Sequence, residues 1–223
     1  MAPLRAAALF ELNRPLRILD GVIPPELRHG QVLVRVAYAG VCRSQIMEAR
    51  GLRSEDRHLP HLLGHEGSGV VEAIGDGVTK VRRGDRVILT WIRSQGFDAA
   101  GTQYRFGSQV LNAGPVTTFN THAVVSENRC VPLPEDVPMD VAVLFGCALL
   151  TGAGIVTNIL EPPAGSTVAV FGVGGVGLTA LMACRLYPSV RLIAVDISAE
   201  KLALARACGA DVVIDARRTD PVA

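Results

Sequence analysis

The sequence has few aromatic residues and little net charge of either sign. Among 223 residues, 4% are aromatic and 19% are charged, and 22 Lys and Arg against 21 Asp and Glu give a formal charge of +1. No basic block is present, so the usual electrostatic footprint of nucleic-acid binding is missing. Because 49% of the residues are hydrophobic, a disordered chain is excluded and a sizeable core can be buried. We therefore expect a folded protein that binds a small molecule and no nucleic acid.

Cysteine is too sparse for a disulfide framework. The cysteines are odd in number and widely spaced, whereas disulfide-stabilised proteins are usually short and densely crosslinked. We expect reduced thiols that are available as metal ligands. The five residues are Cys42, Cys130, Cys147, Cys184 and Cys208.

The sequence lacks a convincing membrane segment. Residues 141–160 and 162–184 carry no charge, but neither stretch has the cationic flanks of a spanning helix, and a run of glycines interrupts the second. Both are better explained as buried strands and helices of an α/β core. The N-terminus has only a short apolar patch before Glu11, so it lacks a secretory signal. We expect a cytoplasmic protein without a membrane partner.

The first part of the chain is predicted to be mainly β. Its apolar runs are short, rich in β-branched residues and bounded by Gly and Pro. One short helix is predicted at residues 43–50. The predicted strands are residues 31–38, 69–74, 86–91 and 122–126.

From Pro138 onward, helical runs alternate with short apolar strands. This alternation predicts a βαβαβ unit with parallel strands. The predicted order is helices 139–146 and 148–160, strand 167–172, helix 175–186, strand 191–196, helix 199–207 and strand 211–215. The change from short strands to alternating helices and strands predicts two domains, residues 1–137 and residues 138–223.

A glycine-rich turn joins the first strand of this unit to its helix. The pattern G-x-G-x-x-G in this context is typical of dinucleotide binding. Its first glycine permits the tight turn, its second lets a pyrophosphate approach the backbone, and its third lets helix and strand pack closely. The alternative is a glycine-rich packing corner, which the complete strand, turn and helix disfavour. The turn consists of Gly172, Val173, Gly174, Gly175, Val176 and Gly177.

Asp196 ends the second strand of the unit, 19 residues after Gly177. A carboxylate at this position would accept hydrogen bonds from the adenosine ribose and repel a 2′-phosphate, so we expect NAD rather than NADP. Lys201 is expected beside the cofactor, where it or a nearby Arg could still accept a phosphate. Without a cofactor, Asp196 would simply cap the next helix.

Three further residues have side chains suited to a metal. Cys42, His65 and Cys147 offer soft to borderline donors of the kind that bind tetrahedral zinc, and three protein ligands leave one position open for a substrate. Their spacing is not that of a local zinc knuckle. By residue type alone, a lone Cys is more often a small buried hydrophobe, and a His among glycines is more often structural.

A resemblance to a known family favours the metal. In order along the chain, the matching segments are GVCRS, GHEGSGVVEAIGDGV, GDRV, GCALLTGAG and GVGGVG. Together they resemble the zinc-dependent alcohol dehydrogenases of the medium-chain dehydrogenase/reductase superfamily, over essentially the whole chain. The resemblance implies a β-rich GroES-like catalytic domain followed by an α/β Rossmann domain, of which only the first βαβαβ half is present.

The resemblance also implies roles for individual residues. Zinc would be held by Cys42, His65 and Cys147. Glu66 would lie beside the metal or replace a ligand, and Ser44 would relay the proton of the substrate hydroxyl. The remaining implied contacts are Arg43 with the cofactor pyrophosphate, Thr151 with the nicotinamide, and Trp91 with the substrate pocket.

Two departures from the family concern whole segments. Relatives with a second, structural zinc carry four clustered cysteines, but no Cys occurs between Cys42 and Cys130, so we expect one catalytic zinc only. Residues 92–114 occupy that region as a long loop, which is more often functional than idle.

Other departures concern single residues near Ser44. Gln45 stands where relatives commonly have an acid that orients the zinc-bound His, and its amide could still accept the imidazole proton of His65. Met47 stands where some relatives end the proton relay with a His, and a thioether cannot carry a proton. Proton exit then needs water or a group such as His58 or His61, although both histidines are more simply interpreted as solvated loop residues.

The predicted function is hydride transfer between an alcohol, or the corresponding aldehyde or ketone, and NAD. The alternatives are a zinc-free quinone or enoyl reductase of the same superfamily and a non-catalytic NAD-binding relic. Because only half of a Rossmann domain is present, we expect a fragment that turns over poorly by itself. In its longer form, the protein is expected to be a homodimer or homotetramer.

Overall fold

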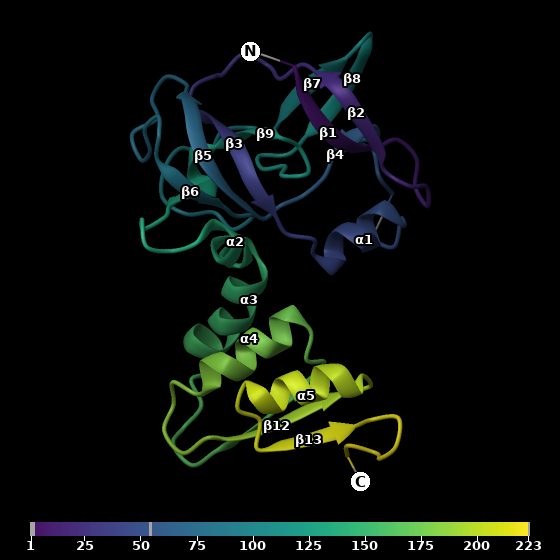
Figure 1. The fold of residues 1–223 in the computed structure, drawn as a ribbon, viewed down its shortest axis with the longest axis vertical. Helices are drawn as coiled ribbons and strands as arrows, with labels where there is room; N and C mark the ends of the chain where they lie inside the picture. Colours follow the sequence, from purple (N-terminus) through teal and green to yellow (C-terminus); the bar gives the residue numbers. More distant parts are fainter. Residues whose placement is uncertain (1–2, 54, 223) are drawn as a thin grey trace. The chain divides into compact units, whose positions relative to one another are not determined.

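The computed structural model describes residues 3–53 and 55–222. The chain forms two compact units, Met1–Cys147 and Ala148–Ala223 (Figure 1). The first unit is rich in strands and the second alternates strands and helices, as the sequence predicts. The predicted domain boundary after residue 137 stays a prediction.

One five-stranded sheet of the first unit has the order β2-β1-β4-β8-β7. All neighbours are antiparallel except β4 and β8, which are parallel. Its inner face packs a core that includes the fully buried ring of Tyr104. The strands are β1 (Leu4–Leu9), β2 (Arg17–Val22), β4 (His61–Leu62), β7 (Thr102–Phe106) and β8 (Gln109–Ala113).

The second sheet of this unit has the order β10-β6-β5-β3-β9 and is antiparallel throughout. Buried valines of its strands, Val32 and Val71 among them, form a second core. All four strands predicted for this part of the chain lie in this sheet. The strands are β3 (Gln31–Ala39), β5 (Gly67–Ile74), β6 (Arg86–Leu89), β9 (His122–Ser126) and β10 (Cys130–Pro132).

Short helices complete the first unit. The predicted helix at residues 43–50 is confirmed as α1 (Arg43–Ala49), and Cys42 is its N-cap. The predicted helix at 139–146 is α2 (Met139–Ala142), which continues as the 3-10 helix Val143–Gly146. Another 3-10 turn, Glu127–Arg129, joins β9 to β10.

Residues 92–114, expected to be a long loop, contain the β-hairpin β7–β8. Gly107 begins the turn with a φ of 57°, which fits the first central position of a type II′ turn. The flanking run TQYRF-GS-QVLNA carries this hairpin signal in the sequence, and the loop interpretation overlooked it.

The second unit contains a three-stranded parallel sheet of order β11-β12-β13, so the predicted βαβαβ arrangement is confirmed. Helices α4 and α5 lie on the same side of this sheet, and α3 packs against α4 (Figure 1). The elements are α3 (Ala148–Ile155) with the π turn Val156–Leu160, β11 (Thr167–Phe171), α4 (Gly175–Cys184), β12 (Arg191–Asp196), α5 (Ala199–Ala207) and β13 (Val212–Asp215).

No single helix in the described part of the chain is long and apolar enough to cross a membrane. The helices Met139–Gly146 and Ala148–Leu160 reach that length and composition only together, as a bent pair.

Candidate metal centre and dinucleotide turn

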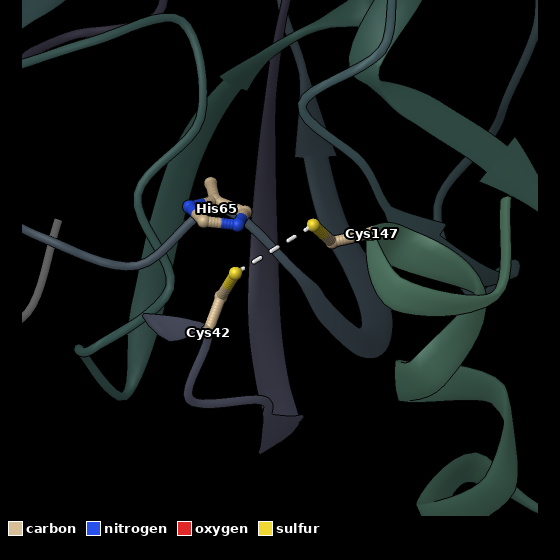
Figure 2. Close-up of side chains that lie close together, drawn as sticks. All are labelled: Cys42, His65 and Cys147. Atoms are coloured by element: carbon tan, nitrogen blue, oxygen red, sulfur yellow. Dashed lines mark hydrogen bonds between the residues drawn. The ribbon is translucent and has the colours of Figure 1, made fainter. Parts of the chain in front are cut away.

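Three side chains from distant parts of the sequence converge in the first unit. A sulfur of Cys42, a ring nitrogen of His65 and the sulfur of Cys147 all lie within 4.8 Å of one another. The two sulfurs are 3.9 Å apart. Figure 2 shows the imidazole and both thiols turned toward a common point.

Each of the three residues comes from a different part of the first unit. Cys42 is the N-cap residue of α1, and His65 lies in the segment between β4 and β5. Cys147 follows the 3-10 helix, whose last carbonyl, that of Gly146, accepts a hydrogen bond of 2.8 Å from the hydroxyl of Thr90, just after β6. The three side chains are therefore positioned by three separate segments rather than by one flexible loop.

The donors and their spacing fit a zinc ion. Two sulfurs bound to one zinc at about 2.3 Å and a tetrahedral angle are roughly 3.8 Å apart, close to the separation seen here. Two thiols and one imidazole are a donor set that zinc accepts, and three protein ligands leave a fourth position open.

The electrostatics of His65 favour the form that can bind a metal. Burial, together with the positive charge of Arg53, lowers the pKa of the His65 imidazole below its usual value of 6.5. The neutral ring, which keeps a lone pair for a metal, is thereby favoured at neutral pH.

Ser44 and Arg43 lie next to this centre on the first turn of α1. The Ser44 hydroxyl donates a hydrogen bond of 3.3 Å to the sulfur of Cys42. Ser44 is half-buried, whereas Arg43 is exposed. The predicted relay hydroxyl is therefore in direct contact with one of the three converging side chains.

Glu66 is buried, with 4% of its surface exposed. It does not belong to the group of converging ligand atoms. Two glycines make room for it, since a Cβ on Gly40 would lie 2.6 Å from the Glu66 carboxyl carbon, and a Cβ on Gly146 would lie 2.6 Å from the Glu66 Cβ. The sequence did not reveal this cradle, because its walls come from segments far apart in the chain.

Gln45 does not orient the His65 ring, contrary to the interpretation of the sequence. Its side-chain oxygen accepts a hydrogen bond from the backbone N–H of Gly64, and its NH₂ group donates to Glu48 at 3.1 Å. No hydrogen bond joins the Gln45 amide to the His65 ring in the described part of the chain.

His61 is not a solvated loop residue. It is 6% exposed, and its ring nitrogens lie 2.8 Å from Asp56 Oδ2 and 3.0 Å from the Leu62 carbonyl. His58, by contrast, is exposed as expected. The solvated-loop interpretation is thus wrong for His61, because β4 carries this residue into the first sheet.

The glycine turn of the second unit has the backbone that its sequence predicts. Gly172 has a φ of 85°, in the left-handed region that favours glycine. A Cβ on Gly177 would collide with the carbonyl oxygen of Gly172, whereas a Cβ on Gly174 would meet nothing within 4 Å. Close packing at Gly177 and open space at Gly174 match the separate tasks expected of these glycines.

Asp196 stands at the carboxyl end of β12 beside this turn. Its two oxygens accept hydrogen bonds of 2.9 Å from the backbone N–H groups of Val173 and Ser198. Burial opposes ionisation, but these hydrogen bonds and the charge of Lys201 outweigh it and lower the pKa of the Asp196 carboxyl. The group is therefore a carboxylate at neutral pH.

The other predicted cofactor contacts occupy helices of the second unit. Gly175 and Val176 begin α4, where backbone N–H groups without helical partners can bind an anion. Lys201 is exposed on α5, and Thr151 is half-buried on α3.

Comparison with known proteins extends these observations to a family. Residues 28–135 match the sequence profile of the Alcohol dehydrogenase GroES-like domain. The chain is 31% identical to an alcohol dehydrogenase zinc-binding domain protein from Burkholderia ambifaria, with a TM-score of 0.88 over 99% of this chain and 66% of that one.

Two further solved structures show the same arrangement. Benzyl alcohol dehydrogenase from Acinetobacter calcoaceticus is 31% identical, with a TM-score of 0.85 over 100% of this chain and 66% of that one. A mycobacterial protein in complex with NADPH is 26% identical, with a TM-score of 0.75 over 95% of this chain and 58% of that one. The chain thus spans 66% of the length of the first two relatives.

Proposed function

Because the chain belongs to the zinc-type alcohol dehydrogenase family of the medium-chain dehydrogenase/reductase superfamily, we propose that it serves hydride transfer between an alcohol and NAD. The same site would act on the corresponding aldehyde or ketone in reverse. The observation that carries the proposal is the convergence of Cys42, His65 and Cys147 within 4.8 Å in the first unit.

Each predicted site residue in the first unit would have a separate role. Cys42, His65 and Cys147 would hold the zinc, which supplies Lewis acidity that lowers the pKa of an alcohol hydroxyl and polarises a carbonyl. Ser44 Oγ would accept the substrate proton and pass it on. Buried Glu66 would lie beside the metal or replace one of its ligands.

The second unit would hold the dinucleotide. The turn from Gly172 to Gly177 and the start of α4 would bind the pyrophosphate, with Arg43 as a further cation and Thr151 at the nicotinamide. We propose NAD because the Asp196 carboxylate, ionised at neutral pH, would repel a 2′-phosphate. The positive charge of Lys201 would instead favour a 2′-phosphate and so NADP. The mycobacterial relative is in complex with NADPH.

Metal analysis tests the proposal directly. We expect one zinc per chain in the wild type and none in Cys42→Ser. Cys208→Ser is the matched control, because Cys208 lies in the second unit, and it should retain the zinc.

The same experiment separates the competing functions. A wild type without zinc would favour a zinc-free reductase. In the longer form of the protein, zinc and bound NAD without hydride transfer to or from any alcohol or carbonyl would favour a non-catalytic relic. Retention of zinc by Cys42→Ser would contradict the proposed ligand set.

Family membership also supports proposals about the protein in the cell. We propose that it acts in the cytoplasm and that its longer form is a homodimer or homotetramer. Sedimentation of the purified longer form tests the assembly, and a monomer at all concentrations would contradict it.

A further inference from the structure

Gln45 connects the two segments that carry the first two metal-ligating residues. It lies on α1, which Cys42 caps, and its side-chain oxygen accepts the N–H of Gly64, the residue just before His65. Gln45 is buried although it is polar. A buried amide is retained at such a place only when both of its ends are hydrogen-bonded.

The surroundings of Gln45 require a side chain with one acceptor and one donor. The Gly64 N–H donates to it, while the Glu48 carboxylate accepts from its NH₂ group at 3.1 Å. The Arg53 guanidinium lies 3.9 Å from the same Glu48 oxygen that accepts from Gln45. An acid at position 45 would satisfy Gly64 but would face the Glu48 carboxylate.

The backbone of Gly64 has little freedom to move, so it limits where the next residue, His65, can lie. Its φ is 91°, and a Cβ there would collide with the Thr118 hydroxyl and lie 2.7 Å from the backbone nitrogen of Phe119. The adjoining Leu63 carbonyl accepts N–H bonds of 3.1 and 3.0 Å from these same two residues. The turn is thus held from one side by residues 118–119 and from the other by Gln45.

We propose that Gln45 is a positioning residue that fixes the separation of Cys42 and His65 by clamping the Gly64 amide, with its polarity set by Glu48. This inference rests on the proposed metal site and deepens it.

Substitution at positions 45 and 48 tests the clamp. Gln45→Leu removes both hydrogen bonds, and Gln45→Glu sets two carboxylates against each other. The double variant Gln45→Glu with Glu48→Gln exchanges donor and acceptor and retains both bonds. Gln103→Leu, on the exposed hairpin β7–β8, is the control.

The first measurement is the affinity for Co²⁺. The metal-free protein is titrated with Co²⁺ alone, and binding is monitored through the thiolate-to-cobalt absorption that appears. We expect each single variant at position 45 to bind Co²⁺ about 10- to 100-fold more weakly. The double variant and Gln103→Leu should bind like the wild type. Tighter binding by Gln45→Glu alone, or equal binding by all variants, would overturn the proposal.

The second measurement needs no metal. Hydrogen exchange of the Gly64 amide in the metal-free chain should accelerate in Gln45→Leu and return to the wild-type rate in the double variant. Unchanged exchange in Gln45→Leu would overturn the clamp. If the wild type binds no Co²⁺, the proposed metal site fails, while the exchange rates still decide whether Gln45 holds the turn. If Gln45→Leu does not fold, the double variant Gln45→Glu with Glu48→Gln decides the question. Faster exchange of its Gly64 amide than in the wild type would also refute the clamp.

Discussion

Glu66 occupies a space that two glycines leave open beside the metal-ligating residues. We predict that Gly40→Ala destabilises the first unit by about 1–3 kcal/mol, the usual effect of overpacking a buried site. The new Cβ would lie 2.6 Å from the carboxyl carbon and Oε1 of Glu66, which is buried and has little room to move. Urea unfolding followed by tryptophan fluorescence measures the change.

The double variant Gly40→Ala with Glu66→Ala tests whether Glu66 causes this loss of stability. Glu66→Ala removes the colliding atoms, so Gly40→Ala should cost much less in its presence than alone. Gly114→Ala is the control, because its Cβ would meet no atom closer than 3.9 Å. Simple additivity of Gly40→Ala and Glu66→Ala would argue against the cradle.

Two glycines of the dinucleotide turn allow stability and binding to be separated. We predict that Gly177→Ala lowers stability by about 1–3 kcal/mol, because its Cβ would meet a backbone carbonyl that cannot swing aside. Gly174→Ala should leave stability nearly unchanged yet weaken NAD binding, since its Cβ would enter the open space that the pyrophosphate approaches. Circular dichroism and calorimetry measure the two quantities. Equal losses of stability in both variants would refute this division.

At this scale, residue types and the family resemblance were enough to predict the converging ligands Cys42, His65 and Cys147. The role of Gln45 was beyond prediction, because its partner Gly64 is 19 residues away and belongs to a different element. Local sequence carries no signal for a hydrogen bond that only the tertiary fold creates.

Among the larger elements, the segment before the hairpin β7–β8 is fastened by one buried carboxylate. Glu127 accepts backbone N–H bonds of 2.6 and 2.8 Å from Thr79 and Lys80 and of 2.6 Å from Phe97. Burial opposes ionisation of Glu127, but these bonds outweigh it and lower the pKa of its carboxyl below the ordinary 4.5. Glu127 in its charged form therefore joins the backbone at Phe97 to the backbone at Thr79 and Lys80.

We predict that Glu127→Gln destabilises the first unit by about 1.5–3 kcal/mol at neutral pH, because its NH₂ group must face N–H donors. A carboxyl whose folded pKa is lowered stabilises above its unfolded pKa and loses that contribution as pH falls through the folded pKa. The difference between wild type and Glu127→Gln should therefore shrink as pH falls below 4.5. Urea unfolding at a series of pH values measures it, and a difference independent of pH would contradict the assignment.

Helices and strands could be predicted where the apolar pattern and the turn residues around them are distinct in the sequence. Four strands of the second sheet, β3, β5, β6 and β9, and the whole βαβαβ series have apolar runs with clear turn signals, and the structure confirms them. Strands β1 and β2 were not predicted, since Leu4–Leu9 lies in an alanine-rich run and β2 alternates weakly. Their pairing partners stabilise them more than their own propensities do.

For the whole molecule, the division into two units gives a selective reporter. Trp91 is the single tryptophan and lies in the first unit, half exposed. We predict that a chelator lowers the unfolding temperature seen by Trp91 fluorescence, because a metal at about 100 times its Kd adds roughly 2.7 kcal/mol to stability. The same chelator should leave Cys42→Ser unaffected. An equal shift in that variant would mean that the chelator acts elsewhere than at the three ligands.

The placement of the third ligand affects how the centre is assembled during synthesis. Cys147 is the last residue of the first unit, 105 residues after Cys42. While a ribosome is still translating the strands in between, only two of the three converging side chains, those of Cys42 and His65, have been made. A zinc ion at the proposed centre would therefore gain its third protein ligand only after the strands of both β-sheets have been made.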